Sequence, residues 1–257
     1  MINLLIFIFF CCEWDRTNYP QVDPKLFYSS NFLNNMLISV VNVLIQTTKE
    51  SNIYKFPIKN NKIFNDLLDK IDEIRSEYLN YEDYHIPISY KVFDNTILRE
   101  SKSSEEYGYY FLKYSKNIKN THLKFPILSR ILQKHQNSIS SMFFSKIEGP
   151  LEIVTHRGPY RGLLRGHITI INDNSNLSEL LILNESSLNW EKNSGFLFDD
   201  TFFHCLNKKD NGKRVSLIFD IKRNFNNENL NKINDWLLNV LNNSEYVNSN
   251  INYLQQS

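Results

Sequence analysis

The sequence predicts a mainly β protein with flanking helices (α+β), built around a sandwich or jelly-roll barrel. From residue 138 onward, short apolar strands alternate with turn residues at a regular pitch, which is typical of such folds. Before residue 138, apolar residues recur instead at the three- and four-residue spacing of amphipathic helices. The sequence has no internal repeat and no flexible interdomain linker. We therefore expect one domain with a helical N-terminal layer.

This change of pattern divides the chain into four segments. We expect an apolar leader or anchor over 1–25, a helical and aromatic layer packed on the core over 26–137, a β core over 138–225, and a closing helix with a polar, disordered tail over 226–257. The spacing predicts helices over 31–48, 64–81, 127–136 and 229–241, and a strand over 107–114. In the core it predicts strands over 139–147, 151–155, 163–171, 179–183, 188–191, 195–199, 203–207 and 214–221. Asn211-Gly212 predicts a tight hairpin between the last two strands, because this pair readily adopts positive φ angles.

Composition excludes some classes of function. The chain has 257 residues with 29 basic and 28 acidic side chains, so nothing in its charge favours binding to nucleic acid or to an anionic membrane surface. The three cysteines are odd in number and two are adjacent, which gives no disulfide framework and fits a reducing compartment. We expect Cys205 to be a small buried hydrophobe.

The N-terminus leaves its location open. Residues 2–12 are nearly all apolar, but a membrane span takes about 20 such residues. The segment also lacks the basic start and the small-residue cleavage site of a signal peptide. Three alternatives remain: a signal-like leader, an anchor that dips into a membrane, or an element packed on the domain. The protein is accordingly cytoplasmic or associated with a membrane through residues 2–12.

The chemistry is concentrated in residues 155–167, which hold two of the six histidines of the chain. On a strand, side chains two apart share a face, so Arg165, His167 and Thr169 point one way and the aliphatic residues between them point the other. Either the polar face meets solvent, or it lines the barrel. In the second case a ligand must compensate the buried polar groups, and the aliphatic face must pack on the helical layer.

His156 ends one predicted strand and His204 begins a later one. Neutral imidazole is a common Fe(II) ligand, and two imidazoles from distant strands converge only if the barrel closes. Arg214 follows ten residues after His204, and a guanidinium suits the far carboxylate of an iron-chelating dicarboxylic acid. Singly, each residue has an ordinary structural interpretation, as a turn histidine or a hairpin arginine. Together they predict a mononuclear iron site with a dicarboxylate co-substrate.

These motifs resemble a known family. Residues 156–160, 164–167 and 198–204, with Arg214, are similar to motifs of the aspartyl/asparaginyl β-hydroxylases, Fe(II)- and 2-oxoglutarate-dependent dioxygenases whose family includes bacterial lipid A hydroxylases. The resemblance spans about residues 56–223. It implies a double-stranded β-helix core with iron on His156 and His204. It also implies Arg214 and Ser145 on the distal carboxylate of 2-oxoglutarate, and Arg165 and His167 on the carboxylate nearer the metal.

Gly158 departs from the common pattern of this chemistry, in which Asp or Glu stands two residues after the first histidine. The animal aspartyl/asparaginyl hydroxylases resemble this chain in having glycine there, whereas the lipid-modifying branch has Asp. We expect Asp200 to orient His204 or the turn before it. Tyr160 and Arg161 lie near the expected mouth, where they could touch substrate.

The expected activity is therefore hydroxylation of an unactivated C–H bond with Fe(II), 2-oxoglutarate and O2. Gly158 favours an aspartyl or asparaginyl side chain of a protein as substrate, and a lipid acyl chain is the alternative. A different class of function is a non-catalytic jelly-roll module that binds a metal or an acidic ligand. Metal-assisted hydrolysis is a further alternative, but it leaves Arg214 unexplained.

Overall fold

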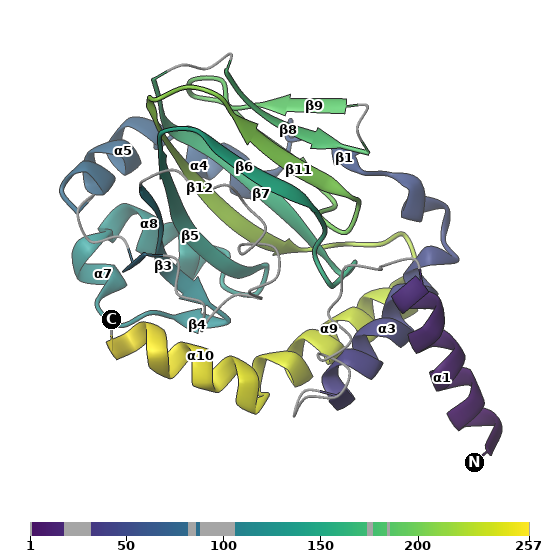
Figure 1. The fold of residues 1–257 in the computed structure, drawn as a ribbon. Helices are drawn as coiled ribbons and strands as arrows, with labels where there is room; N and C mark the ends of the chain where they lie inside the picture. Colours follow the sequence, from purple (N-terminus) through teal and green to yellow (C-terminus); the bar gives the residue numbers. More distant parts are fainter. Residues whose placement is uncertain are drawn as a thin grey trace.

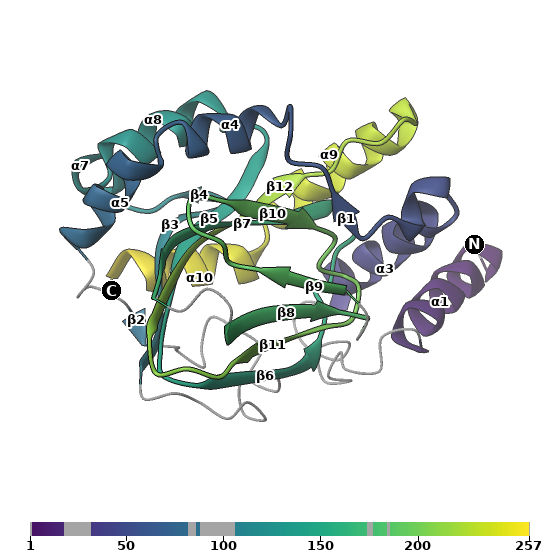
Figure 2. The same ribbon diagram turned by 90° about the horizontal axis from the view of Figure 1, so that it is seen from above.

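The computed structural model describes residues 2–17, 32–81, 86–87, 106–173, 177–183 and 186–256. Two antiparallel sheets face each other, and helices cover the outer face of the larger one (Figures 1 and 2). The fold class predicted from the sequence is confirmed. The helices are α1 (Ile2–Thr17), α3 (Phe32–Gln46), the short 3-10 helix η1 (Lys49–Asn52), α4 (Lys62–Leu68), α5 (Ile71–Leu79), α7 (Thr121–Lys124), α8 (Pro126–Lys134), α9 (Glu228–Asn242) and α10 (Glu245–Gln256).

The eight strands expected in the core correspond to β5–β12. The strands are β1 (Lys55–Phe56), β2 (Ile86–Pro87), β3 (Glu106–Tyr114), β4 (Lys116–Asn117), β5 (Ile139–Glu148), β6 (Leu151–His156), β7 (Leu163–Asn172), β8 (Ser178–Ile182), β9 (Ser186–Asn189), β10 (Gly195–Phe198), β11 (His204–Lys208) and β12 (Lys213–Lys222). The major sheet has the order β1-β10-β7-β12-β5-β3-β2, with β4 paired to β3, and the minor sheet has the order β6-β11-β8-β9. Consecutive strands thus alternate between sheets in part, as in a jelly roll.

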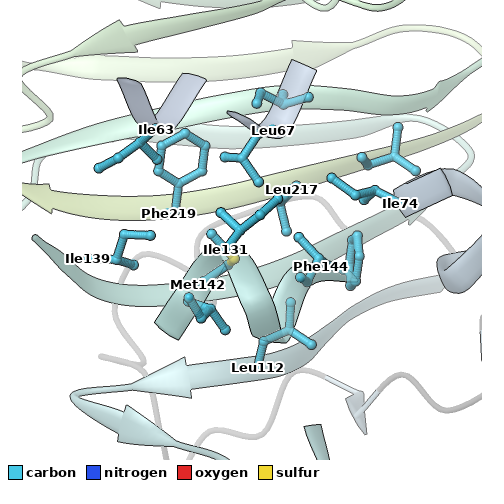
Figure 3. Close-up of a cluster of buried hydrophobic side chains, with 14 of the residues drawn as sticks. Ile63, Leu67, Ile74, Leu112, Ile131, Ile139, Met142, Phe144, Leu217 and Phe219 are labelled. Carbon is cyan, nitrogen blue, oxygen red and sulfur yellow. The ribbon is translucent and has the colours of Figure 1, made fainter. Parts of the chain in front are cut away.

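The outer face of the major sheet packs on the helical layer. Leu164, Ile168 and Ile170 of β7 belong to one buried cluster with Phe64 of α4 and Leu128 of α8 (Figure 3 shows part of this cluster). The aliphatic side of β7 therefore faces the helices, and its polar side lines the barrel. Of the two orientations that the sequence left open, the structure has the second.

A second cluster fills the space between the sheets. It combines Leu151, Ile153, Leu180 and Leu206 of the minor sheet with aromatic residues such as Phe196. Apolar residues of the major sheet therefore contribute to a core on each of its two faces.

Two local expectations are wrong. Residues 210–212 do not close a hairpin, because β11 pairs with β6 and β8 while β12 pairs with β5 and β7. The turn instead crosses between the sheets: Asp210 Oδ1 accepts from Gly212 N at 2.7 Å and from the buried Lys208 Nζ at 2.9 Å. The tail beyond residue 242 is also not disordered, since α10 buries Ile251 and Leu254, the latter against Phe111 and Phe143.

At the N-terminus, α1 lies beside α3 with Cys11 buried, while Ile6, Phe7, Phe9 and Phe10 are exposed. Over the described residues, no helix has the length and apolar character needed to cross a membrane. Residues 82–85 and 88–105, which show only a mixed pattern in the sequence, lie outside the described part.

Candidate active site

The two histidines meet between strands of the minor sheet. β6 ends at His156 and β11 begins at His204, and the two residues are register partners in this antiparallel pair. Their ring centroids are 4.4 Å apart. Residues 48 positions apart in the sequence are thus side by side, as the barrel hypothesis requires.

Each imidazole is held in one orientation by its own backbone. His156 Nδ1 lies 2.8 Å from the carbonyl of Val154, and His204 Nδ1 lies 2.8 Å from the carbonyl of Phe202. A carbonyl can only accept, so Nδ1 carries the proton and the lone pair of each neutral ring is on Nε2. Burial lowers the pKa of His156 to about 4 and lowers the pKa of His204 well below its usual value. Neutral rings with an anchored N–H are what a metal ligand requires.

The carboxyl group of Asp200 fills the space that a side chain at position 158 would occupy. A Cβ atom added to Gly158 would lie 2.3 Å from Asp200 Oδ2 and 2.4 Å from its Cγ. The two backbones are also joined, because Gly158 N donates to Asp200 O at 2.7 Å. Burial raises the pKa of Asp200 to about 7, against the opposing effect of Arg165. The carboxyl group of Asp200, from the turn before β11, therefore occupies the space left by the missing side chain at position 158.

Within the described part of the chain, no group of three or more His, Cys, Asp and Glu side chains lies close enough to hold a metal. The arrangement is a pair of imidazoles with a nearby carboxyl group. This composition fits the two-histidine type of centre that the sequence of residues 156–158 suggests.

Arg165 links the inner face of the major sheet to the turn before β11. Its Nε and Nη2 donate to Asp220 Oδ1 and Oδ2 at 2.8 and 3.1 Å, and its Nη1 lies 3.0 Å from Asp200 Oδ2. Ser141 Oγ donates to Asp220 Oδ2 at 2.6 Å. Asp220 and Ser141 were not predicted from the sequence. Strand alternation gave a signal for Asp220, which lies six residues after Arg214 and so on the same face of β12.

A buried polar region surrounds Arg214 on the same inner face. The Arg214 side chain is buried, and its guanidinium carbon lies 3.8 Å from the centroid of Trp190. Ser216, two residues along β12, has Ser145 of β5 and Thr169 of β7 as its register partners. The hydroxyls of Ser216 and Thr169 are buried and have no hydrogen-bond partner among the described residues. Buried polar groups are usually satisfied, so these hydroxyls indicate a site for a polar ligand.

His167 lies between the two arginines. Its ring stacks on Phe196 with a centroid distance of 4.8 Å, and its Nδ1 is a further buried atom with no hydrogen-bond partner within the described chain. Burial, reinforced by Arg165 and Arg214, lowers the pKa of His167 well below its usual value. A neutral His167 can therefore donate or accept one hydrogen bond toward the polar region.

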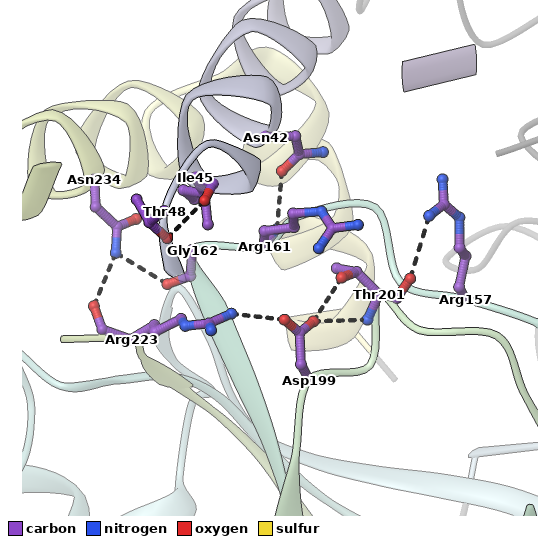
Figure 4. Close-up of polar contacts among 10 residues, drawn as sticks. All are labelled: Asn42, Ile45, Thr48, Arg157, Arg161, Gly162, Asp199, Thr201, Arg223 and Asn234. Atoms are coloured by element: carbon purple, nitrogen blue, oxygen red, sulfur yellow. Dashed lines mark hydrogen bonds and ion pairs between the residues drawn. The ribbon is translucent and has the colours of Figure 1, made fainter. Parts of the chain in front are cut away.

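The turn before His204 is ordered by Asp199, where the sequence had suggested Asp200. Asp199 Oδ1 accepts from Thr201 N at 3.0 Å and from Thr201 Oγ1 at 2.6 Å (Figure 4). Its Oδ2 accepts from Arg223 Nη1 at 2.6 Å, in a fully buried ion pair. Asp199 stands within the motif of residues 198–204, but its role was missed because its pairing with Arg223 depends on the fold.

Tyr160 and Arg161 are both buried. The Tyr160 hydroxyl donates to Asn234 Oδ1 at 2.6 Å, and its ring belongs to the cluster between α3 and α9. Arg161 N donates to Asn42 Oδ1 at 2.9 Å, and the Arg161 guanidinium lies over the ring of Phe202. Tyr160 is thus engaged in packing the helical layer, and its contact with substrate stays a prediction. Contact of Arg161 with substrate stays a prediction.

A family model described as aspartyl/asparaginyl beta-hydroxylase matches residues 69–224, which is more than half of the chain. No curated protein matches. Similar solved structures include a prolyl hydroxylase from Trichoplax adhaerens in complex with a hypoxia inducible factor peptide fragment (TM-score 0.41, 11% identity, 64% of this chain and 90% of that chain). A prolyl-4-hydroxylase from Pseudomonas putida (0.38, 10%, 63% and 98%) and a cupin domain from Bordetella pertussis (0.27, 9%, 34% and 83%) are similar at a comparable level. At these scores the likeness carries no inference about activity.

The family match and the buried imidazole pair within a jelly-roll barrel define the class: the protein is a hydroxylase. More specifically, the chain belongs to the aspartyl/asparaginyl β-hydroxylase family, as the motifs in its sequence predicted.

Proposed function

We propose that the protein is an Fe(II)- and 2-oxoglutarate-dependent dioxygenase that hydroxylates an aspartyl or asparaginyl side chain of a protein. The observation that carries this proposal is the buried pair His156–His204, with each Nδ1 anchored on a carbonyl and each Nε2 left as the ligand atom. A surface or capping histidine has no need of this arrangement.

His156 and His204 would hold the iron, and Asp200 would provide a carboxyl group on the side where Gly158 has no side chain. Bound iron, with 2-oxoglutarate and O2, would supply the oxidising power for inserting an oxygen atom into a C–H bond. The chain itself keeps both imidazoles neutral through burial and fixes their rotation through the Nδ1 hydrogen bonds.

Arg214 and Ser145 would bind the distal carboxylate of 2-oxoglutarate, with Arg165 and His167 nearer the metal. Support comes from the burial of Arg214 and from the hydroxyls of Ser216 and Thr169 beside it, which lack partners among the described residues. A dicarboxylate would satisfy these groups and balance the guanidinium. The rings of His167, Phe196 and Trp190 pack against one another nearby, and all three are buried, so a ligand there would be partly shielded from solvent.

The proposed substrate rests on the family and on Gly158, the residue shared with the animal aspartyl/asparaginyl hydroxylases. A lipid acyl chain is the second candidate, favoured by one observation: α1 exposes large apolar side chains, with Phe9 66% and Phe10 56% exposed, which suits contact with a membrane surface. Incubation with Asp- and Asn-containing peptides and with lipid vesicles, followed by mass spectrometry for the gain of one oxygen atom, separates the two.

The reaction class is tested with purified protein. Anaerobic addition of Fe(II) and 2-oxoglutarate should produce a metal-to-ligand charge-transfer band that neither gives alone, and admission of O2 should release succinate. His156→Ala and His204→Ala should each abolish both signals, while the exposed His122→Ala serves as the matched control. Turnover retained in both site variants would exclude this proposal. A band without any succinate would instead favour a non-catalytic binding module.

A further inference from the structure

Asp220 lies on the inner face of the major sheet, between Ser141 of β5 and Arg165 of β7, and these three residues are register partners across the sheet. Both oxygens of Asp220 accept from Arg165, and Oδ2 accepts from Ser141 as well. A bidentate pair of this kind fixes the plane of a guanidinium and not only its position.

The remaining edge of the Arg165 guanidinium continues the row to the other sheet. Its Nη1 lies 3.0 Å from Asp200 Oδ2, and the side chains of Asp200 and Asp220 are 7% and 14% exposed. The Arg165 side chain is 30% exposed, so these contacts are shielded from water only in part. Ser141, Asp220, Arg165 and Asp200 thus form one continuous chain of contacts that ends at Gly158, two residues after His156.

This arrangement changes what Arg165 can do. Three of its five N–H groups are used, and one guanidinium already faces two carboxyl groups. Such an arginine bridges the two carboxyl groups that it holds, and two of its N–H groups remain for a further acceptor, such as the co-substrate carboxylate nearer the metal. Arg214, which stacks on Trp190, is the candidate for the distal carboxylate.

We infer that Asp220 is a positioning residue of the active site: through Arg165 it holds the carboxyl group of Asp200 in the space beside Gly158 and the histidine pair. This inference rests on the proposed iron site. Asp220 touches neither histidine, so it acts only through the guanidinium that it orients. Loss of one Asp220 oxygen as a charged acceptor would let Arg165 rotate and would release Asp200.

The test measures the affinity of the protein for Fe(II) under anaerobic conditions by competition with a chelator, so that no turnover is needed. Asp220→Asn keeps the shape of the side chain but breaks the bidentate ion pair. It should weaken Fe(II) binding about 10-fold or more, as changes in the residues that support a metal site do. Asp200→Asn should weaken it at least as much. Asp72→Asn, which breaks an exposed aspartate–arginine pair with Arg75, should leave it unchanged.

The decisive result is the double variant. If Asp220 acts through Asp200, Asp220→Asn should have no further effect once Asp200 is Asn, whereas independent structural effects would multiply. Wild-type affinity in Asp220→Asn, or multiplying effects, would overturn the inference. If Asp220→Asn does not fold, Arg165→Lys replaces it, because lysine cannot bind both carboxyl groups as a fork; wild-type affinity there is equally contrary. Failure of the wild-type protein to bind Fe(II) would instead reject the proposed function.

Discussion

Adding a methyl group at position 158 tests whether the Asp200 carboxyl group depends on the missing side chain of Gly158. In Gly158→Ala, the new Cβ would lie 2.3 Å from Asp200 Oδ2 and 2.4 Å from Asp200 Oδ1. Real Cβ atoms keep more than 3 Å from such neighbours, so the carboxyl group must move by about 1 Å. Its ion pair with Arg165 Nη1, now 3.0 Å, would then approach 4 Å and lose its hydrogen bond.

The loss of stability follows from the steric clash and from the lost hydrogen bond between Asp200 and Arg165. Overpacking a buried site costs about 1–3 kcal/mol, and a lost hydrogen bond to a charged group costs about 1.5–3 kcal/mol. Because Gly158 does not have a positive φ angle, backbone strain adds nothing. We therefore expect Gly158→Ala to lower the free energy of unfolding of the iron-free protein by about 2.5–6 kcal/mol, measured by urea denaturation at fixed pH.

The control is a double-variant cycle with Asp200→Ala. Removing the carboxyl group removes the clash, so Gly158→Ala should cost less than about 1 kcal/mol in that background. Gly158→Asp in the same background should return a carboxyl group to the vacated space and recover Fe(II) binding. A neutral Gly158→Ala, or an equal cost with and without Asp200, would refute the reasoning.

Three further outcomes are expected. The pKa of His156 is lowered from 6.5 to about 4, so between these pH values the unfolded chain binds a proton that the folded protein does not bind. The free energy of unfolding of the iron-free protein should therefore fall by up to about 3 kcal/mol as the pH drops from 6.5 to 4. Urea titrations of His156→Gln should show a weaker dependence of stability on pH. Trp190→Leu removes the ring under Arg214, worth about 2 kcal/mol, and should weaken 2-oxoglutarate binding at least 10-fold in anaerobic titrations, with Fe(II) affinity unchanged. Asp199→Ala leaves Arg223 buried without its carboxylate and should cost about 3–5 kcal/mol in urea denaturation.

The sequence predicted the residues of the site better than the contacts between them. His156, His204 and Arg214 stand at spacings that suggest one metal and one dicarboxylate, and the structure brings the two histidines together. Asp220 and Trp190 carry no comparable signal, because their roles depend on which strands are neighbours. That register is set by the closure of the barrel and not by any local pattern.

Strand β7 is a second example of a feature that the sequence does not determine by itself. Its alternation sorts Arg165, His167 and Thr169 from the aliphatic residues, but it does not say which face is inside. In a single sheet with one solvent-exposed face, the polar residues of β7 would have faced the solvent. Only the packing of α4, α5 and α8 on the aliphatic face settles the choice, and that packing joins residues far apart in the sequence. Likewise, the spacing over 64–81 predicted one helix, whereas the chain breaks between α4 and α5, because apolar periodicity reports the buried face and not the continuity of hydrogen bonds.

The contact between Gly158 and Asp200 explains why position 158, considered in the sequence alone, suggests a weaker site than the structure shows. Read along the sequence, glycine at 158 removes the acidic residue that usually completes the ligand set, and the site looks weakened. In space, the absence of a Cβ at 158 is what admits the Asp200 carboxyl group, and the Arg165–Asp220 pair holds it there. The glycine and the aspartate are therefore a single feature, and neither can be changed alone without disturbing the other.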